Sequence, residues 1–222
     1  LYIDREEDLK NQLEKEKEAS VSFLTLFKDD YLRKLTIMVL LTMLCAFLIY
    51  FSFLSELGKE FPEAKDKTIF LGVFVGTVNV FSFLIKVFLF GKITSTYGVK
   101  VSLLLTPILT GVFMLFATGM GLMFGYEVDS SNFILFFLLV ALTRFFNESL
   151  RLSITSPTFK ILYQPIPKAI RFDIHTKIDG VVNEVSSIIS GLLLLLIVFI
   201  PFFELIYIEY VIIFLVVLWV YV

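Results

Sequence analysis

The chain has 222 residues, of which 58% are hydrophobic and 18% are charged, and its formal net charge is −2. A soluble domain of this length has too little interior for so much apolar surface, and the net charge provides no basic field for a polyanion. The composition therefore excludes a soluble enzyme, a disordered chain and a nucleic-acid-binding domain, and it indicates a multi-span membrane protein.

The N-terminal segment differs from the rest of the chain. Acids and bases alternate through residues 1–20, and Phe23, Leu26 and Phe27 then fall on one helical face. This pattern predicts a charged cytoplasmic linker and a short amphipathic helix at the membrane surface across residues 1–30. The chain begins with Leu1, and its last apolar run reaches Val222 without a polar flank, so we expect a segment of a longer protein with a truncated last span.

Residues 31–222 contain six long apolar segments. A helix needs roughly 20 residues to cross ~30 Å of hydrocarbon, and uninterrupted apolar runs favour helices over the alternating strands of a barrel. The sequence therefore predicts an all-α polytopic membrane protein with six transmembrane helices. The predicted spans are 35–54, 68–90, 99–124, 133–150, 180–203 and a last one from 207.

Lysine and arginine are unevenly distributed between the predicted loops. The segment before the first span, loop 91–100 and connection 151–179 hold nearly all of them, whereas the loop between the first two spans holds only Lys59, Lys65 and Lys67. Basic loops stay on the cytoplasmic side of a membrane. We therefore expect the N-terminus of this segment to lie in the cytoplasm. We also expect the membrane to be a bacterial inner membrane.

The loop after the second span resembles the loop motif of the major facilitator superfamily. Gly91, Gly98 and Lys100 match that motif, and Ser95 stands where the family has an acidic residue. The loop also fits a plain turn, since glycine suits a tight bend. The resemblance implies one half of a twelve-span bundle.

The connection between the fourth and fifth spans is similar to a stretch of the bacterial and plastid ATP/ADP translocases. Lys160 is followed by Tyr163-Gln164-Pro165 and then by a basic stretch that ends in Lys177-Ile178-Asp179. The charged lead-in to the first span, SFLTLFKDDYLRK, is similar to the segment before that family's seventh span. The resemblance implies the C-terminal six-span half of a carrier, a missing N-terminal half and a nucleotide substrate.

The fourth span carries Arg144 and Glu148, four residues apart on one helical face. A charge at the centre of a bilayer costs about 2.5–3.5 kcal/mol, so each needs a partner or a function. The two residues fit a cavity that binds an anion, and they fit a structural ion pair equally well. If the pair is structural, we expect loss of Arg144 to leave Glu148 buried without a partner.

Other polar positions extend the set of candidates. Asn79 and Lys86 share a face of the second span, where Gly72 and Gly76 predict a close helix contact, and Lys177 precedes the fifth span. Lys86 fits either an anion site or snorkelling to the membrane surface. The candidate substrate-binding residues are Asn79, Lys86, Arg144, Glu148 and Lys177.

Cysteine and histidine add no chemistry that would indicate catalysis. The one cysteine, Cys45, lies in an apolar run and fits a buried hydrophobe, and the one histidine, His175, has no neighbour at metal-ligand spacing. The sequence also has no Gly-rich phosphate loop after a strand and no Ser/His/Asp set. We therefore expect no metal, no cofactor and no enzymatic activity.

Two functions fit these observations. The first is a secondary membrane transporter of organic anions, with ATP/ADP exchange as the activity that the resemblance implies. The alternative is a transporter-derived anchor or accessory subunit of a larger membrane complex that transports nothing itself. The expected partners are the lipid bilayer, a nucleotide or other organic anion and the missing half, or the subunits of that complex, with no nucleic acid.

Overall fold

The computed structural model describes residues 25–130, 132–199 and 206–222, and within these ranges all regular secondary structure is helical. The helices are α2 (Thr25–Lys28), α3 (Asp30–Glu60), α4 (Ala64–Leu84), α5 (Phe90–Phe124), α6 (Phe133–Leu150), α7 (Ser156–Leu162), α8 (Lys168–Thr176), α9 (Asn183–Phe199) and α10 (Ile206–Tyr221). Three π-helical turns join them: η1 (Ile85–Leu89), η2 (Arg151–Thr155) and η3 (Lys177–Val182). The predicted linker and most of the predicted amphipathic helix fall on residues 1–24, outside the described residues.

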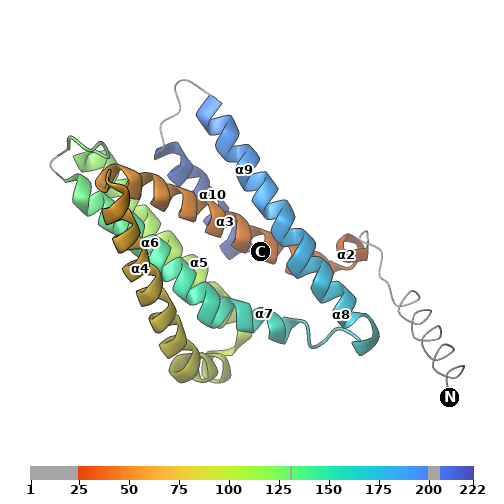
Figure 1. Cartoon of the computed structure of the whole chain (residues 1–222). Coiled ribbons are helices and arrows are strands. Elements are labelled where there is room, and N and C mark those ends of the chain that lie inside the picture. Colours follow the sequence, from red (N-terminus) through yellow and green to blue (C-terminus); the bar gives the residue numbers. More distant parts are fainter. Residues whose placement is uncertain (1–24, 131, 200–205) are drawn as a thin grey trace, which may run out of the picture.

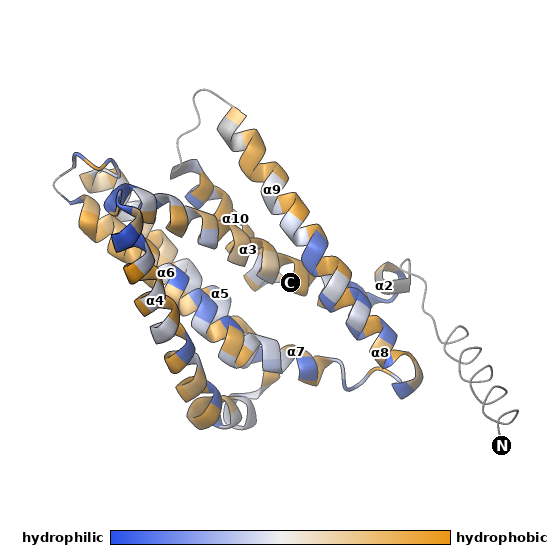
Figure 2. Cartoon of the chain, viewed as in Figure 1, coloured by the Kyte–Doolittle hydropathy of each residue, from blue (hydrophilic) through white to orange (hydrophobic). Residues whose placement is uncertain are grey.

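Four continuous helical stretches are long and apolar enough to cross a membrane. They are Asp30–Glu60, Ala64–Phe124, Phe133–Leu162 and Lys168–Leu196, and a shorter apolar helix covers Tyr207–Tyr221. Figure 2 shows that hydrophobic residues predominate along the helices, with hydrophilic residues near helix ends and also partway along α6. The prediction of an all-helical polytopic membrane protein is confirmed, whereas the count of six spans stays a prediction.

The 61-residue stretch from Ala64 to Phe124 reverses direction within its length. A straight helix of that size would extend about 90 Å, and the backbone instead breaks at Gly98, where φ is 83° and ψ is 171°. Figure 1 shows α4 and the main part of α5 as two arms joined at this turn. Only glycine adopts such a conformation without strain, so the turn depends on Gly98.

The other glycines of this region do not act as predicted. Gly91 lies inside a helix rather than in a loop, because the helix continues up to the break at Gly98. Gly72 and Gly76 have no heavy atom within 4 Å of the space that a Cβ would fill, so the predicted close helix contact at these glycines is wrong for the described residues. Both lie on the outer side of α4, which is only slightly buried.

The predicted connection 151–179 is also largely helical. The helix of the fourth span continues through η2 and α7 to Leu162, and the next helix begins at Lys168 rather than at the predicted 180. Pro157 is tolerated because it lies in the first turn of α7, directly after the π turn. Segment 163–167 forms the break, because Pro165 and Pro167 disfavour the helical conformation of the residues before them.

Helix α3 forms the centre of the molecule. It packs against α6, α9 and α10, and α5 packs against α6 and α10 (Figure 1). Its buried face includes Leu48, Ile49, Phe53 and Leu57, each no more than 1% exposed, and Cys45 is fully buried there as predicted. Helices α4 and α9 are peripheral, since most of their residues are exposed.

The two ends of the bundle differ in chemistry. The start of α3, the residues after Gly98, the end of α7 and the end of α10 meet around one cavity that includes Lys34 and Lys100. We call this the basic end. At the opposite end, Thr118 of α5 donates a hydrogen bond to Glu209 of α10 at 2.9 Å, and Glu56 of α3 pairs with Lys59 at 2.8 Å.

Candidate functional site

A cavity of about 270 Å³ lies between α3, α6, η2 and the start of α9. It brings together the predicted residues Arg144 and Glu148, and we call it the Glu148 cavity. Its lining consists of Met43, Ala46, Phe47 and Tyr50 from α3, Arg144 and Glu148 from α6, Arg151 from η2 and Asn183 from α9.

Glu148 is shared by two arginines. Arg144 Nη1 donates to Glu148 Oε2 at 3.0 Å, which confirms the predicted pairing. Arg151 donates through Nη2 to Oε1 at 2.6 Å and through Nε to Oε2 at 3.2 Å. The side chains of Arg144 and Glu148 are each 15% exposed and that of Arg151 is 20% exposed, so the network is mostly removed from solvent.

The two arginines and one carboxylate leave one formal positive charge in the cavity. Tyr50 contributes to it, because its ring lies 4.7 Å from the Arg144 guanidinium carbon, a distance typical of a cation–π contact. Arg151 also reaches Met43, with Nη1 3.9 Å from the sulfur. Among the described residues, these contacts hold the guanidinium groups without supplying a second carboxylate.

The sequence of α6 sets the direction of this polar face. Arg144, Glu148 and Arg151 are spaced four and three residues apart and therefore share one side of the helix. The other side of α6 is fixed to α5, because Asn147 Nδ2 donates to Thr110 at 3.3 Å. The hydroxyl groups of Thr106 on α5 and Thr155 on η2 form a further hydrogen bond of 2.7 Å. These interhelical bonds turn the charged side of α6 towards α3.

The other predicted site residues lie elsewhere. Asn79 on α4 and Lys86 on η1 are exposed and do not line the Glu148 cavity. Lys177, on η3, forms an ion pair with Asp173 at 2.7 Å and also lies outside the cavity. The structure thus unites two of the five predicted residues, Arg144 and Glu148, and their role in binding stays a prediction.

Sequence reasoning missed the contribution of α3. Met43, Phe47 and Tyr50 are spaced four and three residues apart, so they lie on one helical face. That spacing is a detectable signal, but apolar side chains on a long apolar helix do not reveal which neighbour they contact. Asn183 was recognisable as polar, and only the packing of α9 on α3 brings it to the cavity.

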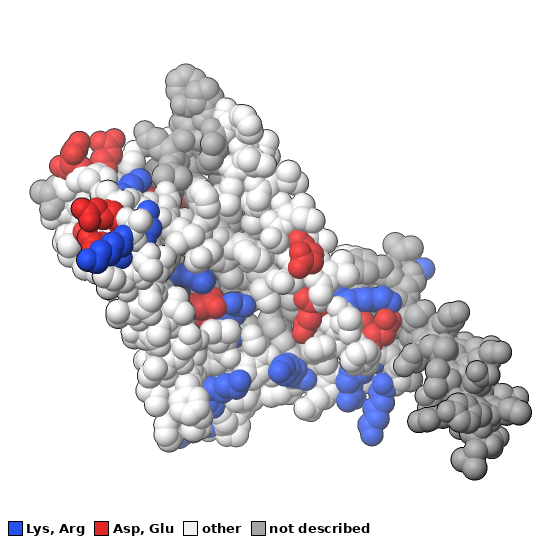
Figure 3. Space-filling view, in the orientation of Figure 1, with Lys and Arg blue, Asp and Glu red and all other residues white. Residues whose placement is uncertain are grey.

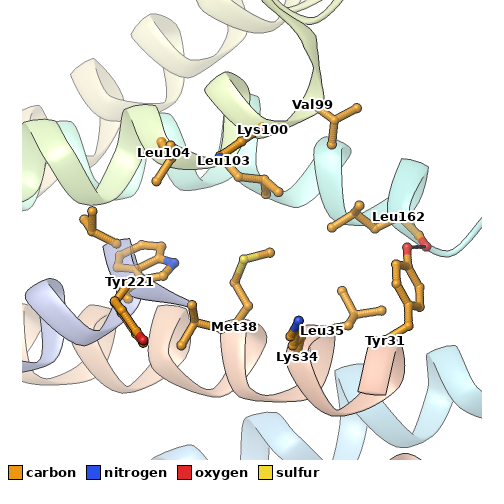
Figure 4. Close-up of a pocket in the computed structure, with 13 residues that line it drawn as sticks. Tyr31, Lys34, Leu35, Met38, Val99, Lys100, Leu103, Leu104, Leu162 and Tyr221 are labelled. Carbon is orange, nitrogen blue, oxygen red and sulfur yellow. Dashed lines mark hydrogen bonds between the residues drawn. The ribbon is translucent and has the colours of Figure 1, made fainter. Parts of the chain in front are cut away.

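A larger cavity of about 450 Å³ lies at the basic end and has a different character (Figure 4). Its walls are mainly apolar, with Met38, Leu103 and Tyr221 around it, and Tyr31 donates to the carbonyl of Leu162 at 2.6 Å at one edge. It contains none of the predicted site residues. Within the described ranges, no group of three or more His, Cys, Asp or Glu side chains could hold a metal.

Comparison with known proteins places the chain among transporters. The model of the TLC ATP/ADP transporter family matches residues 2–222, nearly the whole chain. Over 155 residues the chain is 27% identical to ADP,ATP carrier protein 1 of Chlamydia pneumoniae, a match that covers 65% of this chain and 29% of that carrier. The matched segment is thus less than a third of the carrier's length. The chain belongs to the TLC ATP/ADP transporter family.

Proposed function

We propose that the chain is the C-terminal six-span half of a secondary transporter of the major facilitator type that carries organic anions, nucleotides such as ATP and ADP foremost. The family supports nucleotide transport. The apolar helices support six spans, because the stretch Ala64–Phe124 divides at Gly98 into two arms and Tyr207–Tyr221 adds a further segment to the other three stretches. Carriers of this type bind their substrate between two halves near the midplane.

The observation that carries the proposal is the charge balance of the Glu148 cavity. Arg144 and Arg151 share one carboxylate in a site shielded from water, so the cavity holds an uncompensated positive charge. A phosphate group bound there would supply the missing negative charge, and charge-assisted bonds to arginine are strong and directional. In an anchor that transports nothing, a single arginine would be enough to neutralise Glu148.

We further propose that the basic end faces the cytoplasm of a bacterial inner membrane. Lys34 at the start of α3 and Lys100 after Gly98 lie at this end, and so do the basic residues of α7 and α8. Lysine and arginine are enriched in the cytoplasmic loops of membrane proteins. Lys177 would then lie at the cytoplasmic mouth. Asn79 and Lys86, exposed on the outer side of α4 and η1, would meet the preceding half of the longer protein and complete the pathway there.

The test is uptake of labelled ATP and ADP by the longer protein that contains this chain, reconstituted in vesicles. Arg144→Ala should abolish uptake while the amount of folded protein stays near the wild-type level, since Arg151 still holds Glu148. Arg33→Ala is the matched control, because Arg33 is half exposed and pairs with Asp30 at the surface. Normal uptake by Arg144→Ala would remove this residue from the binding site. Absence of uptake by the wild type, for nucleotides and other organic anions alike, would favour the anchor.

A further inference from the structure

A second charged cavity lies at the basic end, apart from the Glu148 cavity. It has a volume of about 390 Å³ and is formed by α7, segment 163–167 and α8. We call it the basic pocket, and its lining residues are Lys160, Tyr163, Lys168, Arg171, Phe172 and His175. Figure 3 shows Lys and Arg atoms gathered on the surface over α7 and α8. Among the residues that the structure describes, no aspartate or glutamate lines the pocket.

Arg171 is held in position by the backbone. Its Nε donates to the carbonyl of Ile166 at 3.0 Å, and its Nη2 donates to the carbonyls of Ile166 at 2.8 Å and Gln164 at 2.5 Å. Carbonyl groups orient the guanidinium but carry no net charge. The pocket therefore contains a fixed cation whose charge is not balanced by the groups that position it.

Contacts at the floor of the pocket engage the nearby carboxylate of Asp179. Tyr163, 2% exposed, donates to Asp179 Oδ1 at 2.9 Å, and His175 Nε2 lies 3.1 Å from Asp179 Oδ2. The rings of Tyr163 and His175 meet edge to face at 4.6 Å between centroids. Another acid of this region, Asp173, forms the ion pair with Lys177.

The N-terminus of α8 adds to the positive potential. Lys168 is the first residue of this helix, and its N-cap, Pro167, provides no side-chain hydrogen bond to the first N–H groups. The N-terminal end of a helix carries a partial positive charge and binds anions. Lys160, Lys168 and Arg171 thus surround the pocket next to an uncapped helix start, an arrangement whose mutual repulsion a bound anion relieves.

We propose that the basic pocket binds the phosphate group of a phosphorylated ligand, either a soluble nucleotide or the headgroup of an anionic phospholipid. Lys168 also begins the apolar stretch Lys168–Leu196, so the pocket lies where a membrane span starts, at the level of lipid phosphates. Phe172, 80% exposed beside it, supplies an apolar contact for the rest of either ligand. The proposal does not depend on transport by the Glu148 cavity.

The test measures how well individual lysines are protected from chemical labelling, and it does not depend on transport activity. The longer protein is placed in phosphatidylcholine nanodiscs, and the rate at which an amine-reactive reagent labels each lysine is measured by mass spectrometry. Pyrophosphate, ATP or added phosphatidylglycerol should slow the labelling of Lys160 and Lys168 by about tenfold, since a bound phosphate engages the amines. Lys28 and Lys92 are the internal controls, because both are exposed and lie outside the basic pocket.

The two sources of phosphate give different results. Protection by pyrophosphate and ATP in phosphatidylcholine alone identifies a soluble ligand, and protection by phosphatidylglycerol alone identifies a lipid headgroup. In either case Arg171→Gln should remove the protection, whereas Arg144→Ala should leave it unchanged. Protection of Lys160 and Lys168 no greater than that of Lys28 and Lys92 under every condition would overturn the proposal, whatever the outcome of the uptake assay.

Discussion

Arg151 holds both carboxylate oxygens of Glu148, with Nη2–Oε1 at 2.6 Å and Nε–Oε2 at 3.2 Å. Arg144 adds a single bond to Oε2. The expectation from the sequence that loss of Arg144 would leave Glu148 without a partner is therefore wrong. The carboxylate is the member on which the network depends, because among the described residues both arginines of the cavity pair with it.

Replacing Glu148 should consequently be more damaging than replacing Arg144. Glu148→Gln leaves two guanidinium groups close together in a largely buried site, and removing one partner of a buried ion pair costs about 3–5 kcal/mol. We expect a clear drop in the melting temperature of the detergent-solubilised protein. The control is Glu127→Gln at an exposed position, which should shift it little. Equal shifts in the two variants would contradict the central role of Glu148.

The turn at Gly98 offers a matched pair of glycine substitutions. Gly98→Ala introduces a side chain at a φ of 83° and should destabilise the protein by about 1–3 kcal/mol. Gly91→Ala lies in a helix with open space around it, so it should be neutral or stabilising by about 0.5–1 kcal/mol. Thermal unfolding of both variants measures the difference. A tolerated Gly98→Ala would show that the chain reverses direction in another way.

At the opposite end of the bundle, Thr118 and Glu209 link α5 to α10. Both side chains are at most 4% exposed, and Thr118→Val removes the hydroxyl donor while keeping the shape. A buried acceptor that loses its donor costs about 1–3 kcal/mol. Thr77→Val is the control, because the exposed Thr77 donates within its own helix, to the carbonyl of Val73. If the two variants unfold at the same temperature, the interhelical bond contributes nothing to stability.

The basic pocket gives the protein a sensitivity to high pH. Burial raises the pKa of Tyr163 above its usual value of 10.0, and the adjacent Asp179 carboxylate raises it further. A raised folded-state pKa contributes stability below the unfolded value that is lost as the pH rises above it. The melting temperature should therefore fall above about pH 10. The fall should be shallower in Tyr163→Phe and unchanged in Tyr97→Phe, an exposed control.

Much of the helical pattern could be predicted because long apolar runs specify membrane helices. Several boundaries could not, since the continuous helical stretches Ala64–Phe124 and Phe133–Leu162 run through sequence that is polar enough to look like a loop. The pairing of Arg144 with Glu148 was predictable from their spacing and the cost of intramembrane charge. The contribution of Tyr50 was not predictable, because it depends on how α3 packs against α6, and a local sequence pattern does not contain that information.

The same limit explains the placement of Asn79 and Lys86. Periodicity predicts a shared helical face for these two residues, but it does not tell whether such a face turns towards the rest of this chain or away from it. In α4 the buried side consists of Val78 and Ser82, and the two predicted residues lie outside it. The positions of Asn79 and Lys86, which look like a binding site in the sequence, therefore lie on the outer surface of the described segment.

The π turn η2 determines how the two charged cavities are oriented relative to each other. A π turn contains one more residue than an α turn, so everything beyond it is rotated by about 100° relative to an uninterrupted helix. Arg144 and Glu148 precede η2, whereas Lys160 follows it on the same continuous helix. The angle between the Glu148 cavity and the basic pocket thus depends on one inserted residue. Deleting one residue of η2 other than Arg151 would rotate Lys160 about the helix axis relative to Arg144 and Glu148, although the sequence would keep every lysine and arginine of both cavities.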